Sequence, residues 1–381
     1  MTQIKPYKNK DNVTRYYFNA YVGRNPKTGK NVYRKRQGFK TKKHAQIALA
    51  ELLKEIEANG LDPASKEMTF KELYDMWLKQ HRMNVKPSTI ATNRRFVESH
   101  VLPYFGTLEL SEITVVYCQQ IVNKWHEQGY KQYSYFRKVT AQIMRYAEAM
   151  ELMKNNPMSK TILPRKHEEE KKLQFYTKEE MAHFFECLKS HGNYMQLTFF
   201  RLLAFTGVRK SEALSLQWKD IDLFNKNVFI GKTLAIDENT QVIVQSPKTS
   251  TSTRQISLDD ETLKILSNWR SFQRQDYFKA GYNTTSEDQY VFTNSRNELY
   301  YPQVVNDWLN YLIKKYKLPR ITPHHFRHSH ASLLLQAGVP VKEVSERLGH
   351  KDIKITLEIY SHVMPKEAEK TASKFANFVG F

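Results

Sequence analysis

Six chemically distinctive side chains between residues 209 and 360 constrain the fold of this chain more than any other feature. They comprise two arginines, two histidines, a lysine and a tyrosine at wide spacings, within short motifs such as Thr206–Glu212 (TGVRKSE) and Leu348–His350 (LGH). Side chains so far apart act together only if the intervening chain folds back as one domain. The set is Arg209, Lys248, His324, Arg327, His350 and Tyr360.

Together the six side chains suit cleavage of a phosphodiester. That reaction passes through a phosphorane with extra negative charge, which arginine donors stabilise while keeping their own charge. His350 can donate a further hydrogen bond, and a donor placed in advance contributes roughly 10²–10³ in rate. A lysine can give the leaving oxygen its proton. A tyrosine phenol, with an ordinary pKa of about 10, attacks phosphorus if nearby cations and His324 favour the phenolate.

Each motif also has an ordinary structural interpretation when it is taken alone. Arg209 follows a glycine and could be a surface cation, His350 could cap a helix, and Tyr360 could be one of many half-buried aromatics. The histidines between residues 324 and 330 could suggest a metal, but no cysteine lies nearby and no His-Glu-x-x-His pattern occurs. The sequence therefore predicts neither a metal site nor a cofactor.

The charge balance indicates a polyanionic partner. The chain has 59 Lys and Arg against 39 Asp and Glu, a net charge of +20. Nucleic acid is the leading candidate, and a membrane surface is the weaker alternative. No apolar run approaches the roughly 18 residues that a membrane-spanning helix needs, and the first residues lack a signal-peptide core. Only Cys118 and Cys187 occur, which favours buried thiols and a cytoplasmic protein.

The first 60 residues carry half of the excess charge, with 14 Lys and Arg against 4 Asp and Glu. Residues 14–22 alternate with period two, which predicts a strand. Residues 31–39 are expected to form a second strand, but their pattern does not show which side chains lie on which face. Thr41 caps a predicted helix that runs to about Asn59. This pattern favours a small sheet backed by a helix over a disordered basic tail or an ordinary surface sheet. We expect its open face to bind DNA in the major groove, through Arg15, Tyr17, Asn19, Arg34 and Arg36.

The middle of the chain is predicted to be helical. Thr69 and Glu72 form a capping box at the start of the first helix. The next helix begins at Pro87 or Ser88 and carries Arg94 and Arg95 as candidate DNA contacts. Further helices are expected near 114–128 and 132–150. A polar connector follows. After it, helices are expected at 195–206, 209–217, 259–279 and 302–317, with strands at 227–232, 241–245 and 254–258.

The motifs resemble those of the tyrosine recombinases, and more closely those of phage and conjugative-transposon integrases, which add an arm-binding sheet at the N-terminus. The matching motifs are Thr-Gly-Val-Arg-Lys-Ser-Glu, the lysine hairpin, His-x-x-Arg, Leu-Gly-His and a tyrosine ten residues after its histidine. His325 stands where many relatives have an acidic residue, and the spacing to Arg327 favours His324 as the acting histidine. Five short motifs in this order are specific although each is weak alone.

The resemblance implies a role for each position. Arg209 and Arg327 clamp the scissile phosphate, Lys248 is the general acid, and His324 and His350 assist. Tyr360 is the nucleophile, which gives a 3′-phosphotyrosyl bond and a free 5′-hydroxyl, and Glu212 supports the site. The resemblance further implies a tetramer on two DNA sites that exchange strands in pairs, with double-stranded core and arm sites as the DNA partners. It implies a bacterial cytoplasmic protein that is on the nucleoid when DNA-bound. Accessory DNA-bending or excision factors are further implied partners.

The predicted fold class is multidomain α+β. It comprises a small N-terminal three-stranded sheet plus a helix, a helical core-binding domain, and a mainly α catalytic domain with a small antiparallel sheet. The predicted boundaries are 1–62 for arm binding, 66–158 for core binding, 159–174 for the linker and 175–381 for the catalytic domain with its tail. That tail, with Phe375, Phe378 and Phe381, docks either on its own domain or on a neighbouring protomer.

Three other functions are compatible with parts of the sequence. Residues 331–348 resemble a helix-turn-helix, so a non-catalytic DNA-binding regulator is the main alternative, although it leaves the six-residue series unexplained. A topoisomerase-like enzyme would use the same nucleophile but has no need of the basic N-terminal sheet. A metal-dependent nuclease would need an acidic cluster, which the sequence lacks near these motifs.

Overall fold

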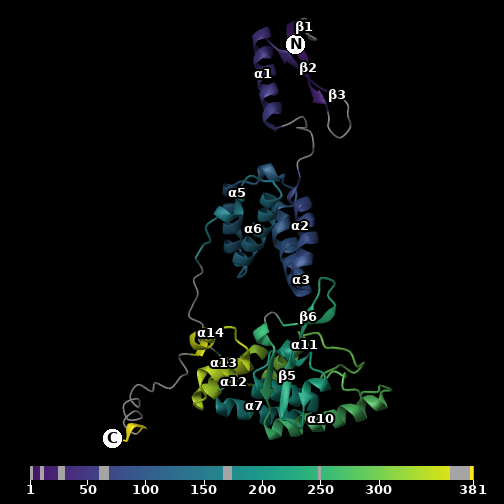
Figure 1. The fold of residues 1–381 in the computed structure, drawn as a ribbon, viewed down its shortest axis with the longest axis vertical. Helices are drawn as coiled ribbons and strands as arrows, with labels where there is room; N and C mark the ends of the chain where they lie inside the picture. Colours follow the sequence, from purple (N-terminus) through teal and green to yellow (C-terminus); the bar gives the residue numbers. More distant parts are fainter. Residues whose placement is uncertain are drawn as a thin grey trace. The chain divides into compact units, whose positions relative to one another are not determined.

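The computed structural model describes residues 3–8, 13–24, 31–59, 68–165, 174–247, 250–360 and 378–380. Contacts within the chain define two compact units (Figure 1): Met1–Trp77 with Val97–Leu163, and Leu78–Phe96 with Pro164–Phe381. No helix of the described chain is long and apolar enough to cross a membrane. The two cysteines, Cys118 and Cys187, are buried thiols, as the sequence predicts.

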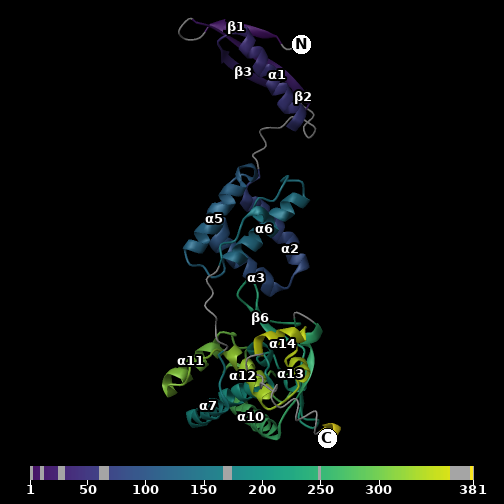
Figure 2. The ribbon, with the colours of Figure 1, turned by 90° about the vertical axis from the view of Figure 1, so that its left-hand side faces the viewer.

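The N-terminal region is the predicted three-stranded sheet backed by a helix. Strands β1 (Ile4–Lys8), β2 (Thr14–Arg24) and β3 (Asn31–Phe39) are antiparallel in that order, and helix α1 (Lys42–Asn59) lies along one face (Figure 2). The small core between them contains Phe18 and Ala20 of β2 with Ala45 and Leu52 of α1. Thr41 accepts a hydrogen bond from the backbone N–H of His44 and caps the helix as predicted.

The register of β3 shows which way its side chains face, which the sequence left open. Residues directly opposite each other on neighbouring strands share a face of the sheet. Arg34 pairs with Ala20 and Arg36 with Phe18, so both arginines belong to the face that α1 covers. Lys35 pairs with Asn19 and therefore shares the open face. The pattern of β3 could not give this facing because polar residues occupy both of its faces.

The open face of the sheet carries aromatic rings next to cations. The Lys35 ammonium lies 5.3 Å from the centre of the Tyr17 ring. The rings of Tyr21 and Tyr33 lie 5.4 Å apart, and each side chain is about half exposed. Because α1 covers the other face, these side chains lie on the face of the sheet that is open to a ligand.

The middle region is helical as predicted. Its helices are α2 (Phe70–Asn84), α3 (Pro87–Phe96), α4 (Leu102–Phe105), α5 (Val115–Glu127) and α6 (Tyr133–Ala149), with a π-helical turn at Val97–Val101 and 3₁₀ turns at Leu110–Glu112 and Met158–Lys160. The capping box of α2 forms, because Glu72 accepts from the N–H of Thr69 at 2.8 Å. Trp125 and Phe136 meet edge to face in the core of α5 and α6.

The third region is mainly helical around an apolar core. Its helices are α7 (Lys178–His191), α8 (Tyr194–Thr206), α9 (Lys210–Ala213), α10 (Asp260–Lys279), α11 (Val304–Tyr316), α12 (Pro323–Gln336), α13 (Val341–Leu348) and α14 (Ile353–Tyr360). Helix α8 is apolar on nearly all sides and lies at the centre of the core. Phe184, Phe200 and Phe326 join α7, α8 and α12 through ring contacts of 5.1–5.5 Å.

Short strands accompany these helices. Strands β4 (Ile221–Asp222), β5 (Asn227–Ile230) and β8 (Arg254–Ser257) form one antiparallel sheet, and β6 (Thr233–Ile236) and β7 (Val242–Gln245) form a hairpin. The helix predicted at 209–217 is wrong beyond Ala213. There the backbone of Leu216 and Trp218 pairs with that of Gln289 and Val291, a long-range contact that outweighs the helical pattern.

Candidate active site

A glycine sets the position of the first arginine motif. Helix α8 ends at Gly207, whose φ of +68° lies in the left-handed region that favours glycine. A Cβ at this position would lie 2.7 Å from the ring of His330 and 2.8 Å from Leu348. The tight turn lets α9 begin immediately, with Arg209 as its N-cap residue.

Glu212 is a buried carboxylate held between two guanidinium groups. Its side chain is 3% exposed, and it accepts from Arg209 Nη1 at 2.6 Å and from Arg254 Nη2 at 3.0 Å. Burial alone would raise the pKa of Glu212, but Arg254 and Arg209 outweigh it and hold the pKa below its ordinary value. The predicted supporting residue is therefore an ionised carboxylate that orients Arg209.

Arg254 is a residue that the sequence analysis missed. It lies on β8, its side chain is 6% exposed, and it donates from Nε to the carbonyl of Arg347 at 2.8 Å. No motif surrounds it in the sequence, where it is one basic residue in a predicted strand. Only the fold brings it to Glu212.

Arg327 completes a cluster of charged side chains with Arg209, Glu212 and Arg254. Its side chain is 2% exposed, and it donates to the carbonyl of Gly207 at 3.0 Å and to that of Leu348 at 2.6 Å. These bonds tie α12 to the ends of α8 and α13. Burial, together with Arg209 and Arg254, lowers the pKa of Arg327, yet a guanidinium stays charged at neutral pH. The cluster therefore holds three cations and one carboxylate.

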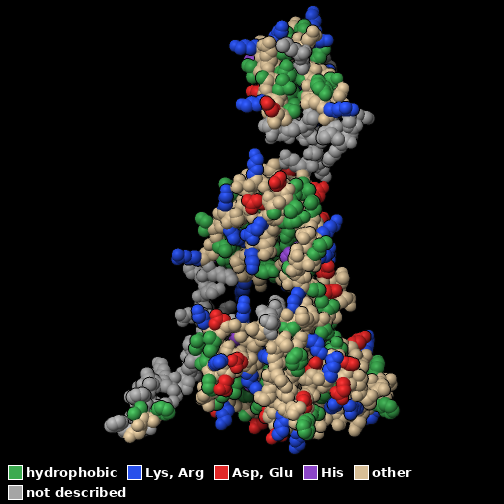
Figure 3. Space-filling model, in the orientation of Figure 1, with side chains coloured by type: hydrophobic (Ala, Val, Ile, Leu, Met, Phe, Trp, Pro, Cys, Tyr) green, Lys and Arg blue, Asp and Glu red, His purple; other side chains and the backbone are tan. Residues whose placement is uncertain are grey.

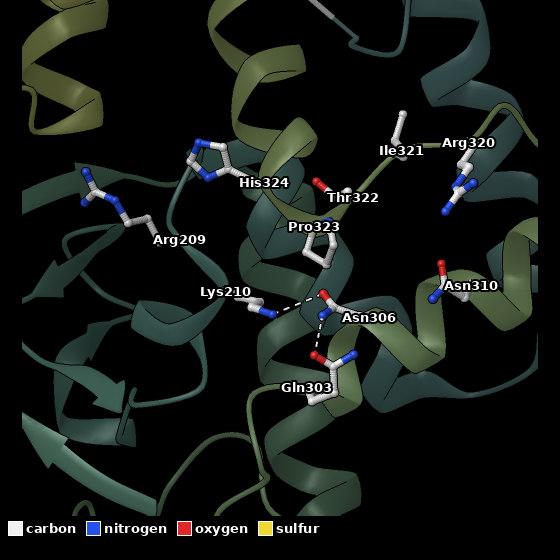
Figure 4. Close-up of a pocket in the computed structure, with 10 residues that line it drawn as sticks. All are labelled: Arg209, Lys210, Gln303, Asn306, Asn310, Arg320, Ile321, Thr322, Pro323 and His324. Carbon is white, nitrogen blue, oxygen red and sulfur yellow. Dashed lines mark hydrogen bonds between the residues drawn. The ribbon is translucent and has the colours of Figure 1, made fainter. Parts of the chain in front are cut away.

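Arg209 and His324 line a cleft of about 420 Å³ (Figure 4). Lys210 donates to Asn306 at 3.1 Å, and Asn306 donates to Gln303 at 2.8 Å, which fixes the orientation of both amides. The charged side chains in the lining are all basic or histidine, so the cleft suits an anion. The lining residues are Arg209, Lys210, Gln303, Asn306, Asn310, Arg320, Ile321, Thr322, Pro323 and His324.

The predicted histidines occupy different positions around this cluster. His324 is exposed at the cleft, while packing around its ring and the charges of Arg327 and Arg209 lower its pKa to about 4. His350 follows α13 and its Nδ1 lies 2.8 Å from the hydroxyl of Thr356. Burial and then the nearby arginines lower the pKa of His350 to about 4 as well. Both rings are neutral at pH 7.

Two of the predicted features fall outside the described residues. Lys248, the predicted general acid, lies between the described Pro247 and Ser250, so its side chain is not placed. The C-terminal tail is described only at 378–380, which leaves out Phe375 and Phe381. Of the described residues, no group of three or more His, Cys, Asp or Glu side chains is arranged to hold a metal ion.

Tyr360 is the last residue of α14 and is 1% exposed. It packs with apolar side chains of α12 and α13, among them Ala331, Val344 and Leu348. Burial raises the pKa of its phenol to about 12, and Arg327 acts in the opposite direction. Its hydroxyl lies 2.7 Å from Nδ1 of His328.

His328, rather than the expected His324, is thus the direct partner of the phenol. The ring of His324 stacks edge to face on that of His328, with centroids 4.8 Å apart. The two histidines are one helical turn apart on α12, a spacing that places them on the same face. The four-residue spacing of His324 and His328 is the feature of the sequence that points to His328 as a second histidine on the same face of the helix.

The remaining predicted DNA contacts lie outside this cluster. Arg15, Tyr17 and Asn19 are on β2 of the N-terminal sheet, where their alternation places them on the open face. Arg94 and Arg95 are in the last turn of α3, where the Arg95 guanidinium lies 5.0 Å from the centre of the Phe96 ring.

Family models match the chain in three consecutive segments. The model described as an arm DNA-binding domain matches residues 4–56. The N-terminal SAM-like domain of phage integrases matches 69–126, and the phage integrase family model matches 174–367. The last segment contains every residue of the cluster from Arg209 to Tyr360.

Two relatives are similar over nearly their whole lengths. A tyrosine recombinase XerC-like protein of Caldanaerobacter subterraneus subsp. tengcongensis is 32% identical over 375 residues, which cover 92% of this chain and 93% of that protein. The ICEBs1 integrase of Bacillus subtilis (strain 168) is 28% identical over 365 residues, which cover 94% and 96%.

Solved structures share the fold. The Tn1549 transposon integrase in complex with a circular intermediate DNA matches with a TM-score of 0.64 and 20% identity, over 81% of this chain and 100% of that one. A lambda integrase tetramer bound to a Holliday junction matches with a TM-score of 0.58 and 17% identity, over 91% and 95%. From the family model and the 32% identical relative, the chain belongs to the phage integrase family of tyrosine recombinases.

Proposed function

We propose that Tyr360 attacks the scissile phosphodiester while Arg209 and Arg327 bind its oxygens. The chain is a site-specific recombinase that cuts and rejoins DNA to integrate and excise a mobile element. What supports these residue roles most directly is the convergence of the side chains in one cluster. The buried Glu212 orients Arg209, and the rings of His328 and His324 lead from the Tyr360 hydroxyl to the cleft that Arg209 lines.

The chemistry needs neither ATP nor a metal in this proposal. The phenol oxygen forms a bond to phosphorus and the bond to the 5′-oxygen breaks, which leaves a 3′-phosphotyrosyl link that preserves the bond energy. His324 and His350 donate hydrogen bonds to the phosphorane oxygens. Lys248 protonates the leaving oxygen. A 5′-hydroxyl from the partner strand later reverses the step and rejoins the DNA.

We further propose that DNA lies along the basic cleft and along the open face of the N-terminal sheet. Arg15, Tyr17, Asn19 and Lys35 form the arm-binding surface. Arg34 and Arg36 are left out because they stand opposite Ala20 and Phe18 on the other face of the sheet. On the face drawn in Figure 3, Lys and Arg side chains (blue) are spread over the described chain. Arg94 and Arg95 of α3 are the proposed core-site contacts in the helical region.

The domain roles follow from the same proposal. Residues 1–62 bind arm sites, 66–158 bind the core site, 159–174 connect, and 175–381 carry out the chemistry. Support for a tetramer on DNA comes from the lambda integrase, which was solved as a tetramer on a Holliday junction. We place the recombinase in the bacterial cytoplasm, on the nucleoid when bound, with accessory DNA-bending or excision factors as partners. A non-catalytic regulator is not favoured for a member of this family.

The test traps the intermediate. A core-site DNA with a nick close to the cleavage position loses a short fragment on cleavage, so the covalent adduct accumulates. We expect an adduct that survives denaturant with the wild type and none with Tyr360→Phe. An equal yield from Tyr360→Phe would overturn the assignment of the nucleophile. Tyr282→Phe, which removes the hydroxyl of a partly exposed tyrosine outside the cluster, is the matched control and should retain the adduct.

A further inference from the structure

The hydrogen bond between His328 and Tyr360 joins a proton acceptor to the proposed nucleophile. Nδ1 of His328 lies 2.7 Å from the phenol oxygen, with the ring planes at 56° and the centroids 5.7 Å apart. The phenol is buried, so water has little access to its proton. When the oxygen attacks, the proton must pass to a group already in contact with it.

The protonation states allow the phenol to be the donor. Burial, then His324, His325, Arg327 and His350, lower the pKa of His328 to about 4, so its ring is neutral at pH 7. Tyr360 keeps its proton, because burial raises its pKa to about 12. Of two neutral partners, a phenol O–H is a stronger donor than an imidazole N–H. The bond therefore runs from the phenol to Nδ1, which leaves the ring proton on Nε2.

Other histidines of the described chain have different partners. Nδ1 of His350 contacts Thr356 at 2.8 Å, and Nδ1 of His325 accepts from the N–H of Thr322 at 3.2 Å. His330 lies between the carbonyl of Ala204 and Nε of Arg347. Among the described histidines, only His328 has a nitrogen at hydrogen-bond distance from the phenol.

We propose that His328 is the general base that takes the proton of Tyr360 during strand cleavage. The inference rests on the proposed role of Tyr360 as nucleophile. As the bond from the phenol oxygen to phosphorus forms, the O–H bond breaks and its proton moves to Nδ1. The bond from phosphorus to the 5′-oxygen breaks, and that oxygen takes a proton from the general acid. In rejoining, the attacking 5′-hydroxyl loses its proton to that acid's conjugate base, and His328 returns its own proton to the phenol.

When DNA is bound, the pKa values of His328 and Tyr360 move closer together. The phosphate carries a negative charge that offsets the arginines around His328 and raises its pKa towards the working pH. Arg327 already favours the phenolate, and bond formation to phosphorus removes the remaining basicity of the oxygen. General base catalysis of this kind contributes roughly 10²–10⁴ in rate.

The experiment compares His328→Asn with His183→Asn in single-turnover cleavage of a core-site DNA. An asparagine amide reaches the position of Nδ1 and keeps a hydrogen bond but does not take a proton. We expect His328→Asn to cleave roughly 10²–10⁴ times more slowly at neutral pH, with unchanged DNA affinity. Its rate should increase with pH as hydroxide replaces the base. His183→Asn, which removes an exposed histidine of α7, should cleave like the wild type.

A DNA with sulfur in place of the leaving 5′-oxygen separates the two proton transfers. Sulfur leaves without a proton, so it rescues a variant that lacks the acid but should not rescue His328→Asn. Wild-type cleavage by His328→Asn would overturn the proposal, and faster cleavage would show that His328 restrains Tyr360 instead. His328→Gln is the second variant if His328→Asn does not fold. An adduct from Tyr360→Phe would refute the proposed function itself, a separate result.

Discussion

Arg254 lies 3.0 Å from the buried carboxylate of Glu212, and both side chains are almost completely excluded from water. Glu212 also accepts from Arg209, which is partly exposed at the cleft. The carboxylate thus joins a buried cation to a cation that lines the cleft. Because Glu212 and Arg254 are paired where water is excluded, removing either one leaves the other as a buried charge with less compensation.

The first expected outcome concerns this pair. Arg254→Met should lower the free energy of unfolding by about 3 kcal/mol or more, because it removes the buried counter-charge of Glu212. Cleavage should also slow, because Glu212 is then held chiefly by Arg209 and orients that arginine less firmly. Urea denaturation of the purified chain measures the first effect and adduct formation the second.

The matched control is an ion pair on the surface. Lys219 pairs with Asp288, and both side chains are at least half exposed, so Lys219→Met should change stability little. If Arg254→Met were no more destabilising than Lys219→Met, the buried pair would not be a structural element of the site.

Gly207 is expected to tolerate no side chain. Gly207→Ala places a Cβ 2.7 Å from the His330 ring at a φ of +68°, and the same residue supplies the carbonyl that binds Arg327. The variant should lose both stability and cleavage, because a shift at this turn displaces Arg209 and Arg327 together. Thermal unfolding and the adduct assay measure the two losses.

Gly281→Ala separates backbone strain from crowding. Gly281 has a φ of +87°, but a Cβ at this position would meet nothing within 4 Å, so the substitution should cost about 1 kcal/mol from strain alone. Gly207→Ala should cost about 1–3 kcal/mol more, the usual effect of overpacking a core. Equal losses in the two variants would show that the contact with His330 and Leu348 is relieved at no cost.

His330 should make stability sensitive to acid. Nε of Arg347 is a permanent donor, so Nε2 of His330 accepts and Nδ1 donates to the carbonyl of Ala204. Burial, then Arg347, lowers the pKa of His330 to about 3, below its ordinary value near 6.5. The unfolded chain therefore binds the proton first. Stability from this group is fully present above about pH 6.5 and is lost progressively as the pH falls towards 3.

Unfolding free energies at pH 7 and pH 5 test this. Other histidines of the cluster also have lowered pKa values, so the specific readout is a difference between proteins. His330→Asn should lose less stability between pH 7 and pH 5 than the wild type, although it starts from a lower value. If His330→Asn lost as much stability as the wild type between pH 7 and pH 5, the acid sensitivity would come from the other histidines.

The sequence predicted those parts of the fold whose signals are local. Thr41 and Thr69 each cap a helix as expected, because the capping residue and its partner are three residues apart. The alternation of β2 correctly placed Phe18 and Ala20 in the core. The six-residue series also led to the family, since its order and spacing are properties of the sequence. The roles of those six residues remain predictions.

Non-local contacts account for what the sequence did not predict. Arg254 belongs to the site because β8 lies beside the end of α13, a relation that no spacing encodes. Residues 216–218 pair with a segment more than seventy positions later instead of extending α9. The choice between His324 and His328 as partner of Tyr360 depended on how α14 packs on α12. The facing of β3 depended on its register with β2.

That register leads to the last expected outcome, which concerns arm-site binding. Lys35 shares the open face with Tyr17 and Asn19, whereas Arg34 stands opposite Ala20 on the covered face. Lys35→Ala should weaken binding to arm-site DNA at every sequence tested and reduce the salt dependence of log affinity by about 1, as loss of one phosphate contact does. Arg34→Ala removes the same formal charge one residue away and should change both quantities less. Titrations at several salt concentrations compare the two variants directly. A larger effect from Arg34→Ala would mean that DNA approaches from the side of α1, and the open face would then need another role.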